Sequence, residues 1–270
     1  MTSLTSALCA ASAAVLIGQT VPPAPAPVAA TLASLAPIVS VWYRGSPAGT
    51  PRAQDLEAIR AIGFRGVTWP SRETAGAADL YRLAASLNLH VTLRIEPEPL
   101  TAVSALAPGD AVDIDVHRTR PELFGAFAWR ALAHGARVVS FDAGGKVGSG
   151  LEAKTIPTWA SAAVAVSAQV GVESRLVEAW RPAGRVALDP PAPDALDLML
   201  LSDSRSWVLV VTNTSRSRVS AVARLPAGVP GALWVNLLDG SLLSMIRQPS
   251  GPRWSLEVGG GVVRVYVVNK

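Results

Sequence analysis

Short apolar segments alternate with amphipathic segments through the first half of the chain. The apolar segments lack strict alternation and cover residues 37–43, 64–70, 89–96, 111–117 and 137–145. Apolar runs of this length are typical of parallel strands that are buried on both faces. The amphipathic segments between them place leucine and isoleucine at helical spacing. This alternation of strands and helices predicts βαβ units and a parallel sheet, that is, an α/β fold.

The alternation breaks between Glu96 and Ala111. Three prolines interrupt this segment, and no amphipathic helix of useful length fits there. A complete eightfold α/β barrel takes about 250 residues. Residues 37–142 supply five strand segments, and about three βα units are missing. The sequence therefore predicts an incomplete, open or irregularly closed α/β barrel.

The period of the pattern changes to two from Arg185 onwards. Seven or eight short alternating segments follow, with turn residues between them, and they predict an antiparallel β-sandwich. A long helix, or two shorter ones, is predicted over residues 155–180. The expected domains are a reduced barrel over residues 34–182 and a sandwich over 183–270.

The first 33 residues are expected to lie outside the fold. They contain no charged residue, and an apolar stretch over residues 4–18 precedes a segment rich in proline and alanine. The stretch has the length of the hydrophobic region of a signal peptide and is too short for a membrane span. We predict a signal peptide and linker over residues 1–33, and hence a secreted or periplasmic protein, although a positive N-terminal region is missing.

Charge and metal-ligand content narrow the possible functions. The formal net charge is +4, but the basic residues are mostly single arginines and form no cluster of the kind that nucleic-acid binding needs. Cys9 is the only cysteine, which excludes an internal disulfide, and the three histidines are dispersed. The sequence therefore predicts no nucleic-acid partner, metal or cofactor, and leaves the oligomeric state open.

Three blocks of the sequence resemble a known enzyme family. They are VWYRGSPAGTPRAQDLEAIRAIGFRGVTWP (residues 41–70), AWRALAHGARVVSFDAGGKVGSGLE (residues 128–152), and the tail with WVLVVTNTS, LLDG and VVRVYVVNK. Together they resemble barrel glycoside hydrolases related to β-galactosidases, with the all-β domain that often follows such barrels. The resemblance implies an exported glycoside-hydrolase-like protein with a carbohydrate partner, acting on β-linked sugars or derived from enzymes that do. The alternative is a non-catalytic carbohydrate-binding or degenerate remnant protein.

The chain departs from this family where catalysis is concerned. Retaining members carry an acid/base glutamate, usually in an Asn-Glu pair, and this sequence has no Asn-Glu pair. The segment that resembles their seventh strand ends in Asp115 rather than in glutamate. We therefore expect weak glycosidase turnover or none.

Carboxylates at strand ends are the candidate catalytic groups. Asp113 and Asp115 flank Ile114 and share one face of a strand, and Asp115 is the candidate nucleophile or base. Glu96 is the candidate partner, because glycosidases need two carboxylates about 5–9.5 Å apart. The alternatives are that Asp113 or Asp115 pairs with Arg118 or Arg120, and that Glu96 is a solvated loop acid.

Further side chains are candidates for substrate binding. The resemblance implies hydroxyl binding by Asp142 and Glu152, and His117 directly follows a strand. Exposed rings at Trp42 and Trp69 would stack on sugars, whereas buried rings would belong to the core. Glu96, Asp115 and Asp142 should then converge at one mouth of the sheet.

A structural role is expected for His134, next to a helix end. The glycine-rich segment 144–150 is expected to be a mobile loop or, in a third hypothesis, a phosphate cradle.

Overall fold

A five-stranded parallel sheet forms the first part of the molecule. The computed structural model describes residues 37–43, 51–70, 76–94, 111–143 and 158–270, except 192, 232 and 247. The sheet has the order β3-β2-β1-β5-β4. Each strand lies within one of the predicted apolar segments: β1 (Ile38–Trp42), β2 (Gly66–Pro70), β3 (His90–Arg94), β4 (Ala111–Asp115) and β5 (Val138–Asp142).

The helices also occupy the predicted segments. They are α3 (Ala53–Ile62), α4 (Ala77–Ser86), the short 3-10 helix η3 (Pro121–Leu123), α5 (Phe124–Ala133) and α6 (Thr158–Ala179). Gly63 ends α3 with a φ of 118°, a conformation that favours glycine, and its N–H donates to the carbonyl of Arg60. Helix α6 is a single helix of 22 residues, which settles the alternative left open by the sequence.

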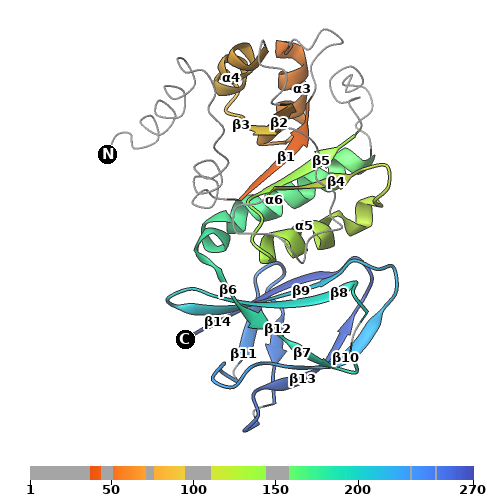
Figure 1. Cartoon of the computed structure of the whole chain (residues 1–270), viewed down its shortest axis with the longest axis vertical. Coiled ribbons are helices and arrows are strands. Elements are labelled where there is room, and N and C mark those ends of the chain that lie inside the picture. The colour runs from red at the N-terminus through yellow and green to blue at the C-terminus, as the bar shows by residue number, and fades with distance from the viewer. Residues whose placement is uncertain are drawn as a thin grey trace.

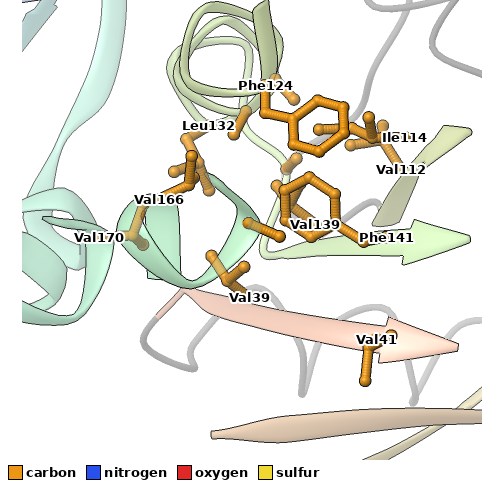
Figure 2. Close-up of a cluster of buried hydrophobic side chains, with 14 of the residues drawn as sticks. Val39, Val41, Val112, Ile114, Phe124, Leu132, Val139, Phe141, Val166 and Val170 are labelled. Atoms are coloured by element: carbon orange, nitrogen blue, oxygen red, sulfur yellow. The ribbon is translucent and has the colours of Figure 1, made fainter. Parts of the chain in front are cut away.

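The strand order has one winding direction. Read from the β4 edge, the order of the strands is β4, β5, β1, β2, β3. The chain therefore moves across the sheet in the same direction when it passes from β4 to β5 and from β1 through β2 to β3. Right-handed crossovers then place the helices on one face of the sheet. Figure 2 shows this apolar layer, in which Val39, Val139 and Phe141 of the strands lie beside Phe124 and Leu132 of α5 and Val166 of α6.

The opposite face of the same sheet is polar. Side chains alternate between the two faces of a strand, so Ser40, Thr68 and Ser140 lie opposite the valines that face the helices. Their three hydroxyl groups are hydrogen-bonded to one another at 2.7–2.8 Å. All three side chains are fully buried. The sheet therefore has one apolar and one hydrogen-bonded polar interior face.

Two antiparallel sheets follow. A six-stranded sheet has the order β12-β11-β14-β9-β8-β6, and a three-stranded sheet has the order β13-β10-β7. Residues of both sheets, including Leu209 and Trp234 of the first and Trp254 and Leu256 of the second, share one buried cluster. The strands are β6 (Arg181–Arg185), β7 (Ala187–Asp189), β8 (Leu196–Ser202), β9 (Ser206–Asn213), β10 (Val219–Arg224), β11 (Leu233–Asn236), β12 (Leu242–Ser244), β13 (Arg253–Val258) and β14 (Val263–Asn269).

The start of this second part differs from the sequence prediction. The alternating pattern was expected to begin at Arg185, but β6 already begins at Arg181. The chain then leaves β6 of one sheet at Arg185 and enters β7 of the other at Ala187. Strand β6 contains Pro182 and has an irregular register between Pro182 and Gly184. Proline lacks an N–H and is tolerated because β6 is the outermost strand of its sheet. The predicted domain boundary at residues 182/183 thus falls inside β6.

Helix α5 connects the two parts. It packs on β4 and β5 and also against β8, β9 and β14 (Figure 1). Just past its end, His134 Nε2 lies 2.6 Å from Asp197 Oδ2 of β8, and both side chains are largely buried. The predicted structural role of His134 is confirmed. None of the helices in the described part is long and apolar enough to span a membrane.

Candidate functional site

Two carboxylates lie side by side at the C-terminal edge of the parallel sheet. Asp115 is the last residue of β4 and Asp142 is the last residue of β5. The two strands pair in parallel, and Asp115 is the register partner of Asp142. Their side chains therefore lie on the same face, which is the face that carries Asp113 and Ser140. The structure brings these two predicted site residues together.

Asp115 shapes the turn that follows β4. Its Oδ1 accepts the backbone N–H groups of His117 at 2.8 Å and of Arg118 at 3.2 Å. Its Oδ2 lies 3.4 Å from Nε of Arg118, on an ion pair that is well exposed to solvent. The alternative in which Arg118 pairs with one of the two aspartates is therefore correct, whereas Arg120 lies beside Glu122.

His117 stands between the ends of the two strands. Its ring Nε2 lies 3.2 Å from the carbonyl oxygen of Ala143, directly after β5. Because a carbonyl only accepts, Nε2 carries the proton in this contact, and Nδ1 of the neutral ring is an acceptor. His117, Asp115 and Asp142 thus form one polar group, which we call the rim cluster.

Asp113 has a different environment from Asp115, although both share one face of β4. Arg94 Nη1 contacts both carboxylate oxygens of Asp113 at 2.7 and 2.8 Å. The indole Nε1–H of Trp42 donates to the same carboxylate at 2.5 Å. The Arg94 and Asp113 side chains are only 9% and 3% exposed. Asp113 is therefore held in a buried ion pair.

The two tryptophans are buried, which corrects the idea that they offer exposed stacking rings. Trp42 lies on the polar face and is 1% exposed. Trp69 is fully buried on the helix-facing side, where its ring centroid lies 5.4 Å from that of Tyr43. Since Thr68 points to the polar face, its neighbour Trp69 must point away from it. The core alternative holds for both rings.

Tyr43 is a polar buried residue that the sequence did not single out. Its hydroxyl donates to Asp55 of α3 at 2.8 Å and accepts the N–H of Arg52 at 2.9 Å. Burial raises the pKa of the Tyr43 phenol far above its usual range, and the contact with Asp55 acts in the same direction. The phenol therefore stays protonated and anchors the start of α3 to the end of β1.

Three predicted features lie outside the described residues. They are Glu96, Glu152 and the glycine-rich segment 144–150. Within the described part, no group of three or more histidine, cysteine, aspartate or glutamate side chains is placed to hold a metal ion. His90 begins β3 and so lies at the opposite end of the sheet.

Arg94 is a second buried polar residue that the sequence did not single out. Alternation along β3 places Arg94 on the same face as Thr92, but it does not show that β3 and β4 approach one another. A basic residue there is a natural partner for a buried aspartate on the same face.

Comparisons with known proteins give low-level similarity to glycoside hydrolases. No family model matches the chain, and no curated protein matches it. Among solved structures it is similar to a maltogenic α-amylase of Thermotoga neapolitana (10% identity, TM-score 0.40, 80% of this chain and 53% of that one). It is also similar to an α-amylase of Geobacillus thermoleovorans (8% identity, TM-score 0.41, 79% of this chain and 62% of that one). A third similar structure is an endoxylanase of Clostridium papyrosolvens (9% identity, TM-score 0.39, 82% of this chain and 73% of that one). The chain spans less than two thirds of both amylases.

Proposed function

We propose that the protein is a reduced, glycoside-hydrolase-like barrel that binds carbohydrate at the C-terminal edge of its parallel sheet and has little or no glycosidase activity. The rim cluster is the observation that carries this proposal. Barrel enzymes build their sites at this edge of the strands. Carboxylate oxygens and an imidazole nitrogen are suitable partners for sugar hydroxyl groups.

The strand order supports descent from a barrel. In a complete barrel the last strand pairs with the first, and here β5 pairs with β1 through Val39 with Val139 and Ser40 with Ser140. In the described sheet, β3 and β4 are the only strands that follow one another in the chain without pairing, and they form its two edges. On this proposal the middle strands are missing, the domains are residues 34–182 and a β-sandwich over 183–270, and residues 1–33 direct export.

The contacts of the aspartates favour binding over turnover. A general acid must carry a proton on the oxygen that faces the leaving group. The oxygens of Asp115 accept from two backbone N–H groups and lie beside the Arg118 guanidinium, so Asp115 does not supply the general acid. Asp113 is occupied by Arg94. Asp142 and His117 are the proposed ligand-binding side chains, with Asp115 fixing the turn that carries His117.

A binding experiment with the full chain tests this proposal. Titration calorimetry against soluble α-linked and β-linked glycans should detect binding to at least one of them. The change Asp142→Asn removes a charged acceptor and should weaken binding by roughly 10-fold to 100-fold. The same substitution at Asp194, an exposed residue between β7 and β8, is the matched control and should bind like the unchanged protein. The β-linked preference that the resemblance implies requires tighter binding of the β-linked glycans.

An aryl-glycoside panel tests the expected lack of turnover. Hydrolysis should be at most residual and should not differ between the unchanged protein and Asp115→Asn. Robust hydrolysis that disappears in Asp115→Asn would instead identify a working glycosidase with Asp115 in its site. Failure to bind any glycan would contradict the proposed function, provided that circular dichroism shows a folded protein.

A further inference from the structure

Arg94 and Asp113 come from the two outermost strands of the parallel sheet. Strands β3 and β4 are separated by β2, β1 and β5. In a flat sheet, four strand spacings would hold them about 19 Å apart. Yet Arg94 Nη1 lies 2.7 Å from the nearer oxygen of Asp113. The sheet is therefore curled, and its two edges approach one another across the polar face.

The contact between the edges involves more than one atom pair. Arg94 Nη2 donates to the carbonyl of Ala111, the first residue of β4, at 3.3 Å. The Arg94 guanidinium carbon also lies 5.8 Å from the centre of the Trp42 ring of β1. Trp42 in turn donates to Asp113. One arginine of β3 thus contacts both the backbone and the side chain of β4, and an aromatic ring at the centre of the sheet.

The other polar contacts on this face do not span the edges. The hydroxyl groups of Ser40, Thr68 and Ser140 connect β1, β2 and β5, which are neighbours in the sheet. Those three strands are already joined by backbone hydrogen bonds. On this face of the described sheet, the contacts of Arg94 reach from one edge strand to the other.

We infer that Arg94 and Asp113 form a clamp that closes the curled sheet between β3 and β4. In a closed barrel, further strands connect such edges by backbone hydrogen bonds. Among the described residues, a buried ion pair connects these edges. Each charge depends on the other, because a buried charge without its partner is strongly unfavourable. This inference concerns how the sheet is held and does not rest on carbohydrate binding.

Hydrogen exchange of the full chain tests the clamp. In Arg94→Met, amide exchange in β3 and β4 should accelerate by tenfold or more relative to exchange in β1, and the unfolding equilibrium constant should rise by roughly 100-fold. The double variant Arg94→Met with Asp113→Leu leaves no unpaired buried charge. It should unfold less readily than Arg94→Met alone.

A matched control breaks an ion pair that has no such role. Arg218 and Glu257 form a pair whose side chains are 72% and 58% exposed. Arg218→Met should leave exchange in β3 and β4 unchanged. Wild-type protection of β3 and β4 in Arg94→Met would overturn the clamp. So would an equal loss of protection in all five strands, because the pair would then contribute only to overall stability.

A conservative variant keeps the test decisive if Arg94→Met does not fold. Arg94→Lys retains the charge but loses the planar group that contacts Asp113, Ala111 and the Trp42 ring together. Exchange in β3 and β4 should then increase selectively, by less than in a variant without the charge. Wild-type exchange in Arg94→Lys would show that a charge alone suffices, and would overturn the clamp as described.

Discussion

The two largest sheets of the molecule distribute polarity in opposite ways. The five-stranded parallel sheet is apolar toward the helices and polar on its other face, where Ser40, Thr68 and Ser140 form hydrogen bonds. In the six-stranded antiparallel sheet, strands β8, β9 and β14, which lie against α5, carry buried apolar side chains on both faces. In β9, Val210 packs toward α5 while Leu209 packs toward the three-stranded sheet.

This distribution reverses the usual expectation. Parallel sheets are normally apolar on both faces because helices cover both, whereas antiparallel sheets often have one polar face toward solvent. Here the antiparallel sheet is the middle layer between α5 and the three-stranded sheet. The parallel sheet is covered by helices on one face and is curled around its own polar residues on the other. Position within the layers, and not the type of sheet, decides the polarity of each face.

The largest expected effect comes from introducing a charge into the doubly apolar sheet. Val210 is buried against α5. Val210→Asp places an unpaired carboxylate there and should destabilise the protein by more than about 4 kcal/mol, which abolishes folding. The matched control is Val222→Asp at a position that is 38% exposed, where we expect a normal yield and a nearly unchanged melting temperature. A folded Val210→Asp protein would mean that the middle-layer description is wrong.

Neighbouring residues of β5 allow a smaller effect to be measured on each face of the parallel sheet. Phe141→Ala removes an aromatic ring from the apolar face and should cost about 3–5 kcal/mol. Ser140→Ala removes one hydroxyl from the polar face and should cost about 1 kcal/mol, because Ser40 and Thr68 keep their own hydrogen bond. Denaturant titration measures both. Equal costs would contradict the contrast between the two faces.

The smallest effect is expected at Asp203, in the turn between β8 and β9, away from the sheet faces compared above. Burial alone would raise the pKa of Asp203, but hydrogen bonds from Arg205 and Ser206 hold this pKa below its ordinary value. A carboxyl group with a lowered folded-state pKa stabilises the fold above its unfolded-state pKa, and this contribution is lost as the pH falls through the folded-state value.

Asp203→Asn should therefore lower the melting temperature slightly at neutral pH, and this difference should shrink as the pH falls below the ordinary pKa of aspartate. Because the group is partly exposed, we expect less than about 1 kcal/mol. A difference from the unchanged protein that grows at low pH would contradict this assignment.

Elements with a clear hydrophobic period could be predicted from the sequence. The five parallel strands and helices α3, α4 and α5 lie within the predicted segments because periodicity is a local property. Gly63 ends α3 in a left-handed conformation that favours glycine, which is also a local property. The two-sheet path around Val186 was not predicted, because Pro182 within β6 looks like a linker when its edge position is unknown.

The candidate site could be predicted only in part. The placement of Asp115 and Asp142 followed from their positions at strand ends. The partner of Asp113 did not follow, because Arg94 reaches it only through the curl of the sheet. Stacking and core packing were both open for Trp69, and alternation from Thr68 places it on the face away from Asp115 and Asp142. Contacts of this kind depend on tertiary geometry that a local pattern does not contain.

The double packing of α5 has a consequence for how the chain folds. Val208, Val210 and Val265 of the six-stranded sheet belong to the same buried cluster as Trp129 of α5. If the chain were cut at residue 182, this sheet face would lose its cover and present a contiguous apolar surface to water, which favours self-association. The two halves should therefore acquire stability together, in one cooperative transition, and a separately produced C-terminal half should aggregate.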